Sequence, residues 1–98
     1  MTKSAFHELG LDRPDELVAK SRLMTLIADE IRKRGLTQAA AGEILGLDQP
    51  NVSALMNEKI SRFSLEKLMS YAGKLGFMVS IHVEGHGVQV DVPLPTAA

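Results

Sequence analysis

Apolar residues recur at helical spacing between Leu17 and Ile31, which predicts a long helix in this part of the chain. Asp12 can cap the start of this helix, Pro14 suits its first turn, and Gly35 is expected to end it. The stripe expected to be buried consists of Leu17, Ser21, Leu23, Met24, Ile27, Ala28 and Ile31.

Two short helices are predicted between Thr37 and Asn57, joined by a tight turn at Gly46. Thr37 and Asp48 carry side-chain oxygens that can cap the two helix starts. On the second helix the pattern points Val52 and Leu55 inward, and leaves a polar, almost uncharged face made of Gln49, Asn51, Ser53, Ala54 and Asn57. Such a pair of helices is typical of a helix-turn-helix that reads DNA.

A further helix is expected from Ser64, which can cap it, to Gly76, with Leu65, Leu68, Met69, Ala72 and Leu75 as its core face. From Phe77 the apolar period changes to two, and glycines follow Glu84, so a β-hairpin is predicted over residues 77–92. An isolated hairpin is marginally stable in water. We therefore expect it to lie on the helices or to pair with a second copy in a symmetric four-stranded sheet.

The first eleven residues are predicted to hold a single helical turn, in which Ser4 caps a segment carrying Phe6 and Leu9. Phe6 is expected at the edge of the core, or alternatively against a partner protein. The predicted chain is one domain, residues 1–98, of mainly α class with about five helices. It comprises a helical module over 12–76 that contains the helix-turn-helix 37–57, a dimerising hairpin over 77–92 and a flexible tail over 93–98.

Charge and composition modify this picture. The chain has 98 residues, no cysteine and a formal net charge of −1. Residues 1–34 carry +1, residues 35–75 carry 0 and residues 76–98 carry −2, so there is no broad basic field. We expect modest non-specific DNA binding and an affinity that depends on dimerisation. The absence of disulfide chemistry, of a signal segment and of a membrane-length apolar run leads us to expect a cytoplasmic location.

Catalytic and metal functions are not predicted. The three histidines are His7, His82 and His86, and no nucleophile stands beside a base in a recognisable motif. His82 and His86 are separated by a strand and its turn, and no second ligand pair follows them, so they are interpreted as surface residues. No cofactor is expected.

The strings Leu36-Thr37-Gln38, Gly46-Leu47-Asp48-Gln49 and Val52-Ser53, together with Asn57-x-Lys59, resemble the lambda-repressor/Cro-like (XRE) helix-turn-helix family. The wider pattern over roughly residues 4 to 84, including FHELGL and DQPNVSALMNEKISRFSLEKL, is similar to the HigA-like antitoxin subgroup. The resemblance implies a transcriptional regulator that represses its own operon, and a RelE/HigB-like toxin as a second partner. A free-standing XRE-type repressor without a toxin, and a protein-binding adaptor that uses the same fold, remain alternatives.

The DNA-binding residues follow from both arguments. Gln49 stands at the first exposed position of the second helix, where a glutamine can match adenine, and Asn51 and Ser53 lie on or beside the same arc. The resemblance implies backbone contacts for Gln38, Asn57 and Lys59, with Gln38 also bracing Gln49. Lys59 and Arg62 are expected in a loop that flanks the second helix and can reach the DNA backbone. The cations Arg32, Lys33 and Arg34 suit the end of the long helix, either in solvent or on phosphate.

Gly42 and Glu58 depart from the family pattern, and so do Ile44 and Met56, which are apolar where the pattern tolerates polar residues. Gly42 stands where alanine is usual, which costs helix propensity but permits a closer approach of helices. Glu58 replaces a common glycine and places an acid near the expected phosphates, so it should weaken the loop contacts.

Overall fold

The computed structural model describes residues 14–84 and 87–91. Its helices are α2 (Pro14–Lys33), α3 (Gln38–Leu45), α4 (Gln49–Met56), the 3-10 turn η1 (Ile60–Arg62) and α5 (Leu65–Lys74). Two strands follow, β1 (Ser80–Glu84) and β2 (Gly87–Asp91). The mainly helical helix-turn-helix fold is confirmed. The count of about five helices is not supported, because the described residues contain four α-helices, and the turn predicted near Phe6 lies outside them.

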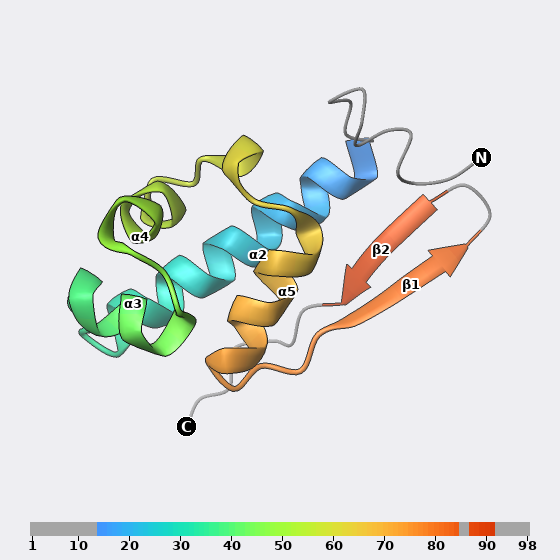
Figure 1. Ribbon diagram of the computed structural model, residues 1–98. Coiled ribbons are helices and arrows are strands. Elements are labelled where there is room, and N and C mark those ends of the chain that lie inside the picture. Colours follow the sequence, from blue (N-terminus) through green and yellow to red (C-terminus); the bar gives the residue numbers. More distant parts are fainter. Residues whose placement is uncertain (1–13, 85–86, 92–98) are drawn as a thin grey trace.

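The long helix α2 is the support on which the other elements lie. It contacts α4, η1, α5 and β2, while α3 packs against α4 and α5 (Figure 1). The side chains that are fully buried between these elements include Leu23, Met24, Ile27, Leu45, Val52, Leu55 and Leu68. Because Val52 and Leu55 belong to this shared core, α4 is held in place through its buried face.

The helix starts are capped as their sequences predict. Thr37 Oγ1 accepts a hydrogen bond from the backbone N–H of Ala40 at 3.0 Å, and Asp48 Oδ1 accepts one from the N–H of Asn51 at 3.0 Å. Ser64 caps α5 in the same way, at 3.1 Å. Each cap satisfies a donor that the first helical turn leaves unpaired.

The first turns of α2 differ from the prediction. Leu17 was expected in the buried stripe but is 40% exposed, and its neighbour Val18 is 58% exposed. Glu16 and Lys20 are buried instead, and both are partnered. The reason is that two helical stripes overlap along α2. The buried stripe continues from Leu23 towards the N-terminus through Lys20 and Glu16, and Leu17 lies on the neighbouring stripe.

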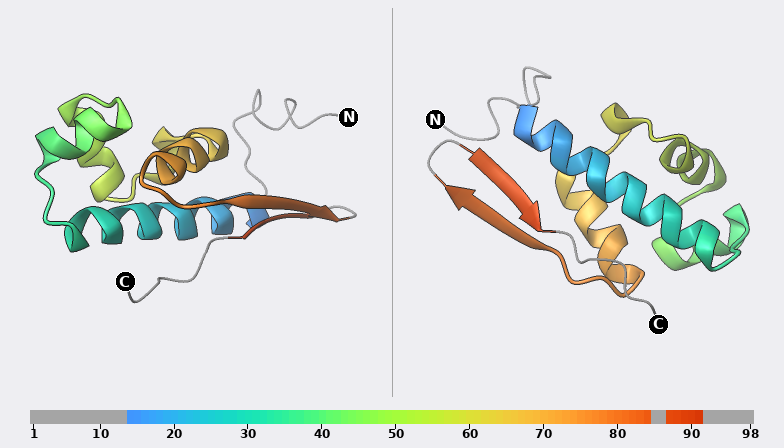
Figure 2. Two further views of the ribbon diagram at one scale, coloured as in Figure 1. Left: turned by 90° about the horizontal axis from the view of Figure 1, so that it is seen from below. Right: turned by 180° about the vertical axis from the view of Figure 1, so that it is seen from behind.

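The strands β1 and β2 pair antiparallel in a two-stranded sheet, with Ser80 opposite Asp91 and Glu84 opposite Gly87. Residues 77–79, predicted to begin the first strand, belong to no regular element. β2 lies on the side of the helices and contacts α2, whereas β1 forms the outer edge (Figure 2). The residues 85–86 of the predicted hairpin turn, and the tail over 93–98, lie outside the described residues.

Candidate nucleic-acid interface

The turn between α3 and α4 packs closely against α3 at a glycine. A Cβ atom at Gly42 would lie 2.5 Å from the backbone oxygen of Leu47 and 3.4 Å from Cγ2 of Val52. Gly46 ends α3 with a φ of 75°, and the N–H groups of Gly46 and Leu47 both donate to the oxygen of Gly42, at 2.7 and 2.9 Å. The close approach expected at Gly42 is present, and it determines where α4 begins relative to α3.

The helix α4 has a buried back and an exposed front. Val52 and Leu55 are fully buried, as predicted. Ala54 was predicted to face outward but is only 7% exposed, because α2 and α3 both cover α4. Gln49 is exposed on the front, and Asn51 and Ser53 are half-buried beside it. The front of α4 is therefore narrower than the sequence pattern indicated.

Asn51 is held from outside its own helix. The Nη2 group of Arg62, in η1, donates a hydrogen bond to Asn51 Oδ1 at 3.2 Å. Arg62 was expected only as a cation able to reach the DNA backbone. No sequence signal indicated this pairing, because the two residues are eleven positions apart and lie in different elements.

Asn57 serves the end of α4. Its side-chain Nδ2 donates to the backbone oxygen of Ser53 at 2.9 Å and to Ser53 Oγ at 3.4 Å. The Ser53 carbonyl also accepts from the backbone N–H of Asn57 at 2.9 Å, so the side chain of Asn57 adds a second bond to the last turn of α4. In this structure the amide nitrogen of Asn57 is thus engaged within the protein, and so is the hydroxyl of Ser53.

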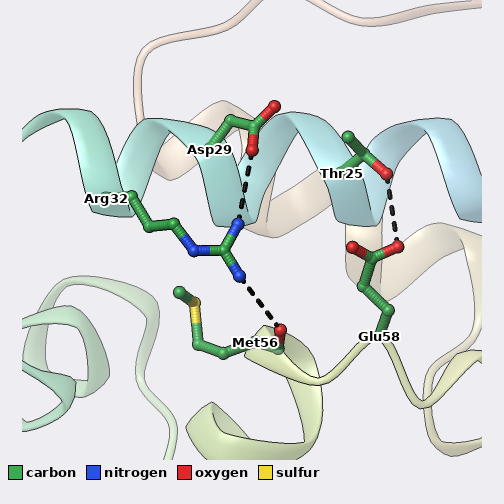
Figure 3. Close-up of polar contacts among 5 residues, drawn as sticks. All are labelled: Thr25, Asp29, Arg32, Met56 and Glu58. Carbon is green, nitrogen blue, oxygen red and sulfur yellow. Dashed lines mark hydrogen bonds and ion pairs between the residues drawn. The ribbon is translucent and has the colours of Figure 1, made fainter.

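The loop after α4 is fastened to α2 by two side-chain contacts (Figure 3). Arg32 donates from Nη2 to the backbone oxygen of Met56 at 3.4 Å, while its Nη1 pairs with Asp29 at 3.3 Å. Thr25 Oγ1 donates to Glu58 Oε1 at 3.3 Å. Glu58 has a φ of 54°, a left-handed conformation that favours glycine. Glu58 therefore adopts a backbone conformation that suits glycine, the usual residue of the family at this position, better than glutamate.

The comparisons with known proteins agree with this geometry. A family model described as a helix-turn-helix domain matches residues 5–84. The chain belongs to this helix-turn-helix family. Among solved structures, it is similar to a protein whose name assigns it provisionally to the XRE family of transcriptional regulators. The identity is 39%, the match covers 72% of this chain and 80% of the other, and the TM-score is 0.66. A comparison with curated proteins finds no match.

Within the helix-turn-helix protein, no hydrogen bond joins the side chains of Gln38 and Gln49 among the described residues. Gln38 is the first residue of α3 and Gln49 the first of α4, and both are exposed. The described residues show no hydrogen bond between them, so the bracing of Gln49 by Gln38 is not present in this structure. Lys59 is exposed in the loop after α4, on the same stretch as Glu58.

Several cations of this helix-turn-helix protein are used to join helices. Arg34 pairs with Glu30 at 2.7 Å and donates from Nη2 to the backbone oxygen of Leu75 at 2.5 Å, which ties α2 to the end of α5. Lys74 donates to the backbone oxygen of Leu45 at 3.2 Å and so caps the end of α3. Of the cation run that ends α2, Lys33 is exposed and makes no such contact among the described residues.

Other kinds of site find little support in the described part of the chain. No group of three or more histidine, cysteine, aspartate or glutamate side chains gathers there. None of the helices in the same part is long and apolar enough to cross a membrane. Burial raises the pKa of Tyr71, whose ring packs edge-on against Phe63 with centroids 6.0 Å apart, in the core and not at the interface.

Proposed function

We propose that this protein is a sequence-specific DNA-binding transcriptional regulator that inserts α4 into the major groove. The observation that carries the proposal is the front of α4: a polar surface on a short helix whose back is fully buried at Val52 and Leu55. Recognition helices in helix-turn-helix proteins present their N-terminal residues to base edges. Gln49 occupies that place, and the family match over residues 5–84 supports the same reading.

The residues take different roles in this proposal. Gln49 reads a base, with a donor and an acceptor that match adenine, and Asn51 reads a neighbouring one. Lys59 and Gln38 contact phosphates that flank the groove. The role of Asn57 is revised by its hydrogen bonds: it stabilises the end of α4, and only its carbonyl oxygen remains for a DNA contact.

The active form in this proposal is a symmetric dimer on a palindromic operator. A net charge of −1 leaves one copy with weak attraction to DNA. Two copies related by a two-fold axis would place two α4 helices in successive major grooves, about 34 Å apart. The outer edge of β1 supports this assembly, since β2 is the only strand that pairs with β1 among the described residues.

A gel-shift titration with the DNA upstream of the protein's own gene tests the proposal. Gln49→Ala should lose the difference between that DNA and a scrambled duplex, because it removes a base contact. Lys59→Ala should weaken binding to both duplexes alike and reduce the slope of log K against log salt by about 1. The absence of any shift at low salt would overturn the proposal and favour a protein-binding adaptor built on this fold.

We further propose that the regulator is the antitoxin of a type II toxin–antitoxin pair and represses its own operon. The support is the resemblance of its sequence to the HigA-like subgroup and the exposed apolar pair Leu17 and Val18 on α2, which offers a surface for a second protein. The expected partner is a small basic ribonuclease of the RelE/HigB type. The test is whether the adjoining reading frame encodes such a protein and whether the two co-purify. A locus without one would leave a free-standing repressor.

A further inference from the structure

The contact between Arg62 and Asn51 changes what Asn51 can offer to DNA. Its backbone N–H is already taken by Asp48 Oδ1, and its side-chain oxygen accepts from Arg62 Nη2 at 3.2 Å. No other hydrogen bond of the Asn51 side chain is found among the described residues. The oxygen uses one of its two lone pairs on Arg62 and is held towards it, whereas the amide nitrogen keeps two N–H donors.

Arg62 is held beside Asn51 because the segment that carries it, residues 60–63, is packed against the core. It ends η1, whose first residue, Ile60, packs against the core, and the next residue, Phe63, is 4% exposed. The N–H of Arg62 donates to the oxygen of Lys59 at 3.0 Å, which closes the 3-10 turn. The guanidinium has five donors and uses one of them on Asn51. Beside the start of α4, the guanidinium of Arg62 and the amide nitrogen of Asn51 therefore supply several N–H donors.

We propose that Arg62 is a specificity-determining residue that sets the base read by Asn51. A free asparagine pairs with adenine by giving one donor and one acceptor. Arg62 holds the amide oxygen on the side of η1 and so turns the amide nitrogen away from it. The base edge that best fits the two donors of that nitrogen is guanine, which offers O6 and N7 side by side. Arg62 acts through Asn51 and is a positioning residue in this sense. The inference rests on the proposed function, since it concerns which base α4 reads.

The test is selection of DNA from a pool of duplexes with a randomised core by the full chain and its variants, followed by sequencing. Asn51→Ala identifies the base pair that Asn51 reads, as the position whose preference is lost. At that position the wild type should prefer guanine. R62A should shift the preference towards adenine by about 10-fold, because the amide is no longer held in one orientation and can turn both its oxygen and its nitrogen to the base. In the N51A background R62A should cause no further change there.

Two comparisons make the result specific. R62M keeps the aliphatic stem of the side chain and removes its donors, so it should shift the preference as R62A does even if R62A is poorly folded. Lys59→Ala removes one positive charge from the same loop and should lower affinity without changing any base preference.

The outcomes separate the inference from the function on which it rests. If the wild type enriches no sequence, the proposed function fails. If it enriches a site but N51A flattens no position, or both Arg62 variants leave the preference at that position within about two-fold, the inference is overturned and the function stands.

Discussion

At the scale of single residues, Gly42 is a position at which the helix-turn-helix geometry leaves no room for a Cβ atom. Gly42→Ala should lower the free energy of unfolding by about 1–3 kcal/mol, because a Cβ atom 2.5 Å from the Leu47 backbone oxygen forces the turn away from α3. Gly73→Ala is the matched control: Gly73 lies in α5 with nothing within 4 Å, so alanine should stabilise by about 0.5–1 kcal/mol. Urea denaturation measures both. Equal effects of the two substitutions would contradict the role assigned to Gly42.

Glu58 is the second residue with a testable conflict. Glu58→Gly should raise the free energy of unfolding by about 1 kcal/mol, because glycine adopts the φ of 54° without strain. The lost bond from Thr25 spans 3.3 Å at an exposed site and offsets little of this gain. Glu58→Gln keeps the strained backbone and removes only the charge. Both variants should bind DNA more tightly at low salt if the acid faces phosphate, whereas only the glycine variant should be more stable.

At the scale of elements, side-chain contacts attach α4, the proposed recognition helix, to α2. Arg32→Ala should cost about 0.5–1 kcal/mol of stability, since it removes the contacts with Met56 and Asp29 at an exposed site. Lys33→Ala removes the same charge one residue later and should change stability by less than about 0.5 kcal/mol. Thermal unfolding of the two variants compares them directly. An equal loss in the two variants would show that charge, and not the contact with α4, matters here.

The elements also show how far sequence reasoning reaches. Caps at Thr37, Asp48 and Ser64 were predictable, because a side-chain oxygen before an apolar run acts locally. The contact of Arg62 with Asn51 was not, because it depends on how η1 folds back beside α4. Leu17 shows a third case. It is apolar and was assigned to the core, but the neighbouring stripe that contains Glu16 and Lys20 is buried instead. Packing against other elements, which the sequence of α2 does not contain, selects between the two stripes.

At the scale of the whole molecule, charge and architecture lead to the same requirement. The residues proposed to read bases, Gln49 and Asn51, carry uncharged amides, while the cations Arg34 and Lys74 make contacts that join helices. One copy therefore has the means of discrimination but little electrostatic attraction, with a net charge of −1. Presenting α4 twice raises affinity without new contacts in either copy. In the proposed dimer, the sheet edge at β1 would join the two copies.

The dimer can be tested by prolines in β1. Successive residues of a strand direct their N–H groups to opposite sides, so prolines at Ile81 and His82 affect different neighbours. One of the two substitutions, the ladder variant, removes an N–H that donates to β2. The other, the edge variant, removes an N–H that faces the outer edge of the sheet. If β1 pairs with β1 of a second copy, the edge variant should keep the wild-type circular dichroism but sediment as a monomer, and should bind operator DNA with a shallower salt dependence. The ladder variant should lose strand content. A wild-type chain that stays monomeric at about 100 µM, or an edge variant that remains dimeric, would contradict the proposed assembly, because strand addition at an edge requires its backbone donors.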